Sequence, residues 1–99
     1  MTLRKQLKMA KVDLILEARQ KTHGDFETHA YISQCLKIAM RMESGNWTIL
    51  SNAHQEALEM IMHKIARILN GNPDVHDHWD DIAGYATLAS KAINAESAL

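Results

Sequence analysis

The chain has 99 residues, of which 46% are hydrophobic and 23% are charged, and its formal net charge at pH 7 is −1. This length predicts a single domain over residues 1–99, and the balance of residue types is that of a globular domain, which excludes a disordered tail. The near-neutral charge argues against a general electrostatic attraction to nucleic acid or to an anionic membrane, so we expect neither partner.

The sequence also argues against the secreted and membrane-spanning classes. Cys35 is the one cysteine and therefore has no partner for an internal disulfide. No apolar run approaches the roughly 18 residues of a membrane span, and the start of the chain lacks the apolar core of a signal peptide. We expect a protein of the cytoplasm.

Glycines divide the chain into four segments with helical spacing of apolar residues. The first helix is predicted from about Thr2 to Gln20, followed by a turn that contains Gly24. Asp25 is the predicted N-cap of a second helix over about residues 26–42, which residues 43–46 end.

A short connector that holds Trp47 precedes the third predicted helix, which covers about residues 53–69. Ser51 or Asn52 is its predicted N-cap, and Gly71 follows its end. Trp47 is a candidate for a ligand contact, with plugging of the end of a helical bundle as the alternative.

A fourth helix is predicted over about residues 77–95, after a loop that holds Pro73. No segment shows the strict alternation of a half-buried strand. Four helices joined by short loops predict an all-α fold, a four-helix bundle. Because so short a chain buries only roughly 60–65% of its unfolded surface, we expect a dimer or tetramer to complete the bundle.

The third predicted helix has an apolar side and a polar side. The side expected to face the core holds Leu58, Ile61, Met62, Ile65, Ile68 and Leu69. The polar side holds Glu56, Glu59, His63, Lys64 and Arg67. Two carboxylates one turn apart can share a divalent cation, and the lysine and arginine can bind phosphate oxygens. From this helix alone, a solvated face of i,i+4 ion pairs is the stronger interpretation.

The fourth predicted helix gives stronger support for a functional site than the third. Its expected core stripe is Trp79, Ile82, Ala83, Ala86, Ala89 and Ile93. Asp77 and Asp81 lie on the opposite side, and Tyr85 and Leu88 continue that side as a stripe that we expect to be partly covered. Carboxylates at the head of a covered stripe need a lysine, an arginine or a metal ion as partner. Asp77 could instead be the N-cap of this helix.

Three stretches of the chain resemble a known superfamily. They are Thr22–Phe26, Glu56–Glu59 with His63–Ile68, and Asp77–Tyr85. In them the chain resembles small phage and prophage proteins related to the MazG-like, all-α nucleoside triphosphate pyrophosphohydrolases. The resemblance implies that four acids hold Mg²⁺ against a triphosphate, with Mn²⁺ as a substitute. Water then attacks the α-phosphorus, which releases a nucleoside monophosphate and pyrophosphate.

The resemblance carries over to individual residues. Glu56 and Glu59 match the first acidic pair of the superfamily, and Asp81 matches the last acid of the second pair. His78 stands where that pair has a glutamate, so Asp77 would supply the fourth ligand.

The resulting expectation is an enzyme with assigned residues. The predicted metal ligands are Glu56, Glu59, Asp77 and Asp81. The predicted catalytic residues are Glu56, Glu59, Lys64, Arg67 and Asp81. The predicted substrate contacts are Lys64, Arg67, Trp47 and Tyr85. If the protein is phage-encoded, it would act in the cytoplasm of a bacterial host.

Two alternatives remain open at this point. One is a non-catalytic, phage-type helical module that binds a nucleotide or a host protein, which His78 and the small size of the chain support. The other, a minor one, is a zinc site around His76, Asp77 and His78, although neither C-x-x-C nor H-x-x-x-H is present.

Overall fold

The structure, a computed structural model, describes residues 3–42 and 45–97, with side chains for residues 10–42 and 45–93. Over these ranges the chain forms α-helices, one short 3-10 helix and no strand, which confirms the all-α prediction. The elements are α1 (Leu3–His23), α2 (Phe26–Arg41), η1 (Trp47–Ile49), α3 (Asn52–Asn70) and α4 (His76–Ser97). No helix within these ranges has the length and apolar content to cross a membrane.

The helix ends follow the local signals with small shifts. Asp25 caps α2 by accepting a hydrogen bond from the Thr28 amide at 3.0 Å, and Ser51 caps α3 through the His54 amide at 3.2 Å. The prediction that α1 ends at Gln20 is wrong, since the helix continues to His23. The predicted start at Thr2 and residues 43–44 of the predicted break lie outside the described residues.

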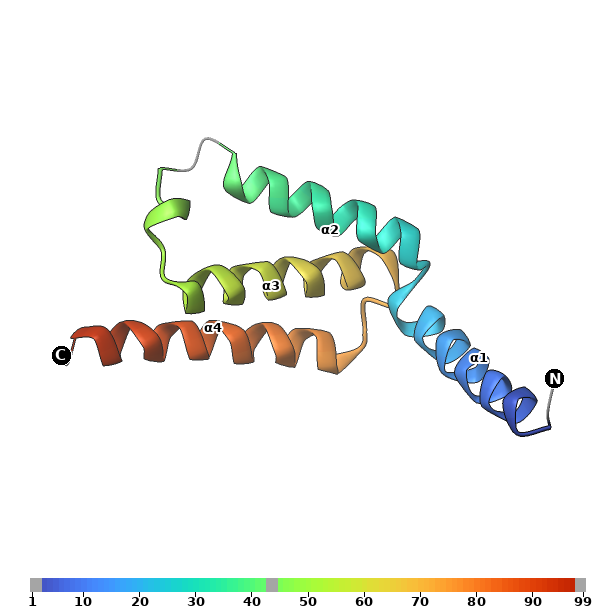
Figure 1. Ribbon diagram of the computed structural model, residues 1–99. Coiled ribbons are helices and arrows are strands. Elements are labelled where there is room, and N and C mark those ends of the chain that lie inside the picture. Colours follow the sequence, from blue (N-terminus) through green and yellow to red (C-terminus); the bar gives the residue numbers. More distant parts are fainter. Residues whose placement is uncertain (1–2, 43–44, 98–99) are drawn as a thin grey trace.

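The helices form an elongated molecule of 57 × 29 × 28 Å, because only three of them pack along their lengths. Helix α3 lies between α2 and α4, and α1 extends away from the end at which it meets α2 (Figure 1). In a single chain α1 therefore stands apart from the other three helices, which is a difference from a closed four-helix bundle; the prediction was a bundle that a dimer or tetramer completes. The difference arises at the turn after α1, which directs that helix outward.

Two glycines hold the α1–α2 turn against the α3–α4 turn. Gly24 has a φ of 78°, and a Cβ on it would lie 2.3 Å from the carbonyl oxygen of Asn70. A Cβ on Gly71 would lie 2.3 Å from the carbonyl oxygen of Thr22, which accepts a hydrogen bond from the Asn72 amide at 3.0 Å. The two turns are thus in backbone contact, and only residues without a side chain fit there.

The buried side chains of the single chain are small or polar. They are Ala57 and Ala66 together with His29, Ser33, Lys64 and His78. Ala57 and Lys64 lie on one flank of α3 and Ala66 on the other, so α4 and α2 cover the two flanks. The apolar side between the flanks is half-buried, except for the exposed Leu69.

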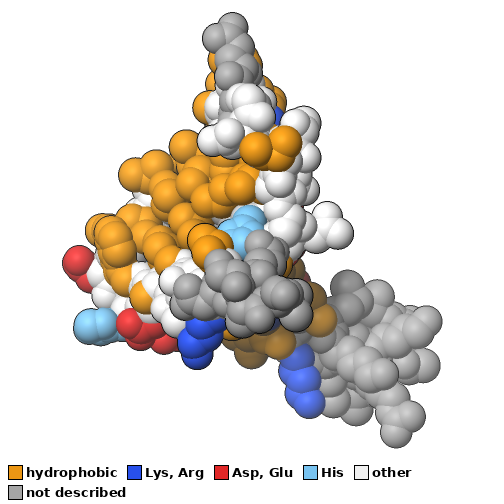
Figure 2. All heavy atoms as spheres, turned by 90° about the vertical axis from the view of Figure 1, so that its left-hand side faces the viewer, with side chains coloured by type: hydrophobic (Ala, Val, Ile, Leu, Met, Phe, Trp, Pro, Cys, Tyr) orange, Lys and Arg blue, Asp and Glu red, His pale blue; other side chains and the backbone are white. Residues whose placement is uncertain are grey.

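The predicted core stripes are therefore partly wrong. Leu69 is 65% exposed, Trp79 54% and Ile93 53%. Apolar side chains gather over a broad face of the molecule, as Figure 2 shows. The free Cys35 is exposed as well.

Candidate functional site

Charged and histidine side chains gather where the α1–α2 turn, the second half of α3 and the start of α4 meet. We call this group the junction site. Its members are Arg19, His23, Lys64, Arg67, His78 and Asp81.

An ion pair joins α3 to α4 in the junction site. Lys64 Nζ donates to Asp81 Oδ2 at 2.8 Å, and the lysine is only 9% exposed. The hydrogen bond and the charge of Lys64 lower the pKa of Asp81, so the acid is ionised at neutral pH. The interpretation of Lys64 as part of a solvated face is wrong, and the partner that Asp81 needs is this lysine.

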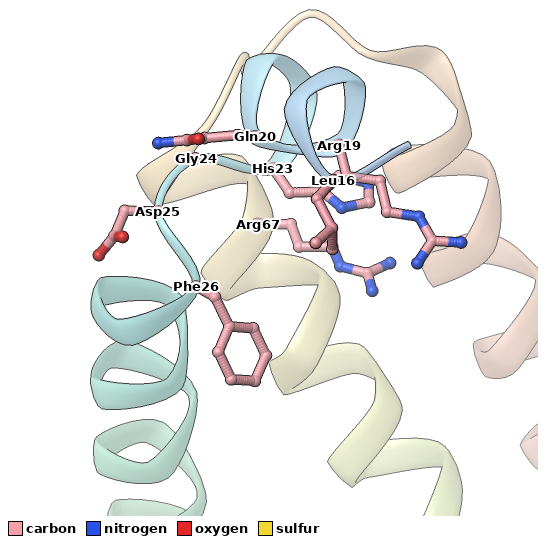
Figure 3. A pocket seen from close by; sticks show the side chains of 8 residues that line it. All are labelled: Leu16, Arg19, Gln20, His23, Gly24, Asp25, Phe26 and Arg67. Carbon is pink, nitrogen blue, oxygen red and sulfur yellow. The ribbon is translucent and has the colours of Figure 1, made fainter. Parts of the chain in front are cut away.

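Arg67 lies half-buried on α3, one turn after Lys64. Burial lowers the pKa of Arg67 and is the largest cause of its shift. The carboxylate of Asp81 raises this pKa, and the guanidinium of Arg19 lowers it. Arg67 also lines a cavity of about 420 Å³ between α1, the α1–α2 turn and α3 (Figure 3). The guanidinium is thus influenced by a carboxylate of α4 and a cation of α1.

His78 belongs to the contact between α4 and α1. It is 2% exposed, its ring centroid lies 5.2 Å from that of His23, and its Nε2 lies 3.5 Å from the Thr22 carbonyl oxygen. Burial, followed by the charge of Arg67, lowers the pKa of His23 to about 4. His78, which departs from the pattern of the superfamily that the chain resembles, therefore packs against the stretch Thr22–Phe26, called the THGDF turn below.

A second histidine pair joins α2 to α3 beside the junction site. His29 Nε2 lies 3.3 Å from His63 Nδ1, and the rings meet edge to face. Burial, with the charge of Arg67 as the next cause, lowers both pKa values, that of His63 to about 4. His29 Nδ1 is buried without a hydrogen-bond partner. Both rings are therefore neutral at pH 7.

The four acids predicted as metal ligands lie apart in the single chain. Glu59 forms an ion pair with Arg41 of α2, and Asp81 with Lys64. Glu56 and Asp77 are exposed, and Asp77 lies in the first turn of α4 and not at its N-cap. Within the described ranges, no three His, Cys, Asp or Glu side chains are placed to hold a metal ion.

The two aromatic residues predicted as substrate contacts lie at different places. Trp47 is in η1, at the end of α3 remote from the junction site, and its ring centroid lies 5.3 Å from the guanidinium carbon of Arg41. Tyr85 lies one turn after Asp81 on α4, and both residues line a shallow hollow. The charge interaction with Tyr85 also raises the pKa of Arg67. The structure thus brings Tyr85, but not Trp47, to the junction site.

Three members of the site were not predicted as site residues, namely Arg19, His23 and His78, and of these Arg19 alone lies outside the stretches that carry the resemblance. It lies on α1, the helix that adds little to the resemblance, and periodicity places it on a solvated face. The signal that was available is its position one turn before His23 and the THGDF turn.

The comparisons with known proteins give a family without an assigned function. A family model described as "Domain of unknown function (DUF6378)" matches residues 5–93. No curated protein and no solved structure matches the chain.

Proposed function

Because the chain belongs to the DUF6378 family, whose description assigns no activity, we propose a function from the chemistry of its own residues. We propose that it is a MazG-like enzyme that hydrolyses a nucleoside triphosphate to a nucleoside monophosphate and pyrophosphate. The substrate would bind at the junction site.

One observation carries this proposal: two cations of α3 and one carboxylate of α4 lie together. Lys64 is bonded to Asp81, and Arg67 is near enough for the same carboxylate to shift its pKa. Lysine and arginine can bind phosphate oxygens and neutralise charge that develops on them. An ionised carboxylate within reach of the phosphates can orient an attacking water and accept its proton.

A magnesium site would have to be built from the four predicted carboxylates, those of Glu56, Glu59, Asp77 and Asp81. Oxygen donors of this kind suit Mg²⁺. As the single chain places them, however, two of the four are engaged with Arg41 and Lys64, and no three come together among the described residues. They do not fit one ion in this arrangement, so we derive no step through the metal, and a requirement for Mg²⁺ or Mn²⁺ stays a prediction.

The test is a panel of ribo- and deoxynucleoside triphosphates, each incubated with Mg²⁺, with Mn²⁺ and without a divalent ion. We expect chromatography to show monophosphate and pyrophosphate for one or a few bases. Asp81→Asn should lower the rate about 100-fold or more, because the carboxylate is lost, while circular dichroism shows the same helix content. Asp74→Asn makes the same charge change in the exposed loop before α4 and should leave the rate unchanged. Full activity in Asp81→Asn would contradict the assignment.

The second candidate is the non-catalytic helical module that binds a nucleotide or a host protein. The ion pairs of Glu59 and Asp81 favour it, since they engage two of the four predicted metal ligands with cations. The same panel distinguishes the two candidates. Nucleotide binding that needs no divalent ion, with intact triphosphate throughout, supports the module, and release of pyrophosphate excludes it.

We further propose that the protein is phage-encoded and works as a homo-oligomer in the cytoplasm of a bacterial host. The resemblance to phage and prophage proteins supports the source. Large apolar side chains on the surface of the single chain support the oligomer.

A further inference from the structure

A cavity between α1 and α3 contains two arginines that face the same space. Arg19 of α1 and Arg67 of α3 both line it, and Figure 3 shows the two guanidinium groups directed to the same side. The charge of Arg19 lowers the pKa of Arg67, which agrees with their proximity. Two like charges thus meet at a cavity wall.

Neither arginine forms an ion pair with a carboxylate among the side chains that the structure describes; Asp81 acts on the charge of Arg67 but is itself bonded to Lys64. The ion pairs found there join Arg41 to Glu59 and Lys64 to Asp81. Asp25 also lines the cavity, but its carboxylate accepts hydrogen bonds from the amide and the hydroxyl of Thr28, and it points away from the arginines in Figure 3. The cavity is therefore a place of unbalanced positive charge.

The parts of the cavity wall formed by Leu16, Phe26 and His23 carry little charge of their own and therefore suit an anion. Leu16 and Phe26 supply apolar surface beside the arginines, and in the single chain they are 56% and 77% exposed. His23 adds no charge at pH 7, since its pKa is about 4. A volume of about 420 Å³ is in the range of small-molecule sites.

We propose that Arg19 and Arg67 together bind the pyrophosphate group of a phosphorylated ligand. Two planar guanidinium groups offer paired donors to adjacent phosphate groups, which a single arginine cannot do. This inference rests on the proposed function for the identity of the ligand as a nucleoside triphosphate. It adds Arg19 to the site and places the β- and γ-phosphates in the α1–α3 cavity, so released pyrophosphate should also bind there.

The experiment is titration calorimetry of the full chain with inorganic pyrophosphate at low ionic strength. Wild type should bind pyrophosphate more tightly than it binds inorganic phosphate. Arg19→Gln should weaken pyrophosphate binding about tenfold or more, because charge-assisted hydrogen bonds are lost. Arg19→Lys, which keeps the charge but not the paired donors, should bind with intermediate affinity. Lys11→Gln removes a cation from an exposed position on the same helix and should bind like wild type.

Equal pyrophosphate affinity in wild type and Arg19→Gln, or no binding to wild type, overturns the inference. Failure of this inference can be told apart from failure of the proposed function. If pyrophosphate binding depends on Arg19 but no triphosphate is hydrolysed, the arginine pair stands and the enzyme assignment falls. If triphosphates are hydrolysed and Arg19→Gln changes neither binding nor rate, the enzyme stands and the arginine pair falls.

Discussion

The tightest constraint on a single residue lies at Gly24. Its φ of 78° is in the left-handed region, where a Cβ is strained, and the space a Cβ would occupy is taken by the backbone of Asn70. Gly24 also donates its amide to the Gln20 carbonyl at 2.8 Å, which closes the end of α1. This one residue thus both ends a helix and lets the α1–α2 turn approach α3, which is how His23 and Arg19 reach the junction site.

We predict that Gly24→Ala lowers the free energy of unfolding by about 2 kcal/mol or more, from strain and overpacking. Gly84→Ala is the matched control. Gly84 lies within α4 with nothing within 4 Å of its added Cβ, so alanine there should be neutral or should stabilise by up to about 1 kcal/mol. Urea denaturation followed by circular dichroism measures both. Equal stability of Gly24→Ala and wild type would show that the two turns are not in contact.

Between elements, two pairs of histidines join the helices alongside the buried Ala57 and Ala66. His23 and His78 join α1 to α4, and His29 and His63 join α2 to α3. Buried imidazoles next to the cations Arg67, Lys64 and Lys37 favour the neutral form, and the lowered pKa values of His23, His29 and His63 follow from burial first and these charges second. The packing of the helices is therefore linked to proton binding.

We predict that the fold is less stable in mild acid. His23 and His63 have folded pKa values of about 4, below the ordinary value of 6.5, so the unfolded chain binds more protons between these limits. The contribution of these two histidines to the free energy of unfolding is therefore fully present above pH 6.5, and it is lost as the pH falls toward 4. The urea midpoint should fall over this window in wild type and fall less in His63→Gln. His76→Gln, which changes an exposed histidine, should follow wild type. A midpoint that stays constant from pH 7 to pH 5 would contradict the linkage.

At the scale of the whole molecule, the single chain leaves much apolar surface in water. Leu14 and Leu16 of α1 are 65% and 56% exposed, Leu88 of α4 is 62% exposed, and α1 extends away from the other helices. Monomeric proteins rarely leave large apolar patches uncovered, and Figure 2 shows apolar side chains gathered over a broad face of this chain. A second copy of the chain is the partner that we propose for this surface.

Light scattering coupled to gel filtration should accordingly give two or four times the single-chain mass. Leu14→Glu should shift the population toward the monomer, because each buried leucine contributes about 1.5–3 kcal/mol to association. Lys11→Glu, which introduces the same carboxylate at an exposed polar position of α1, should keep the wild-type mass. A monomeric wild-type protein would remove the basis for the proposed oligomer.

Features that depend on residues close together in the chain follow from the amino-acid sequence alone. Apolar spacing predicted helices close to α2, α3 and α4. Residue type predicted Asp25 as the cap of α2 and Ser51 or Asn52 as the cap of α3, and the structure has Asp25 and Ser51. These signals act within one turn of the chain, so no knowledge of distant segments is needed. The sequence also predicts Lys64 and Arg67 as phosphate-binding residues and Asp81 as a metal ligand, and the structure brings these three side chains together.

Which sides of the helices meet depends on the tertiary packing. Periodicity shows which residues share a side of a helix, but not which side faces a neighbour. Here α3 packs through its flanks, so Lys64 is buried on Asp81 while Leu69 stays exposed, the opposite of what an apolar core predicts. The addition of Arg19 to the site depends on the turn at Gly24, which brings the end of α1 to α3. Such contacts join residues far apart in the chain, and their geometry is set by the packing of whole elements.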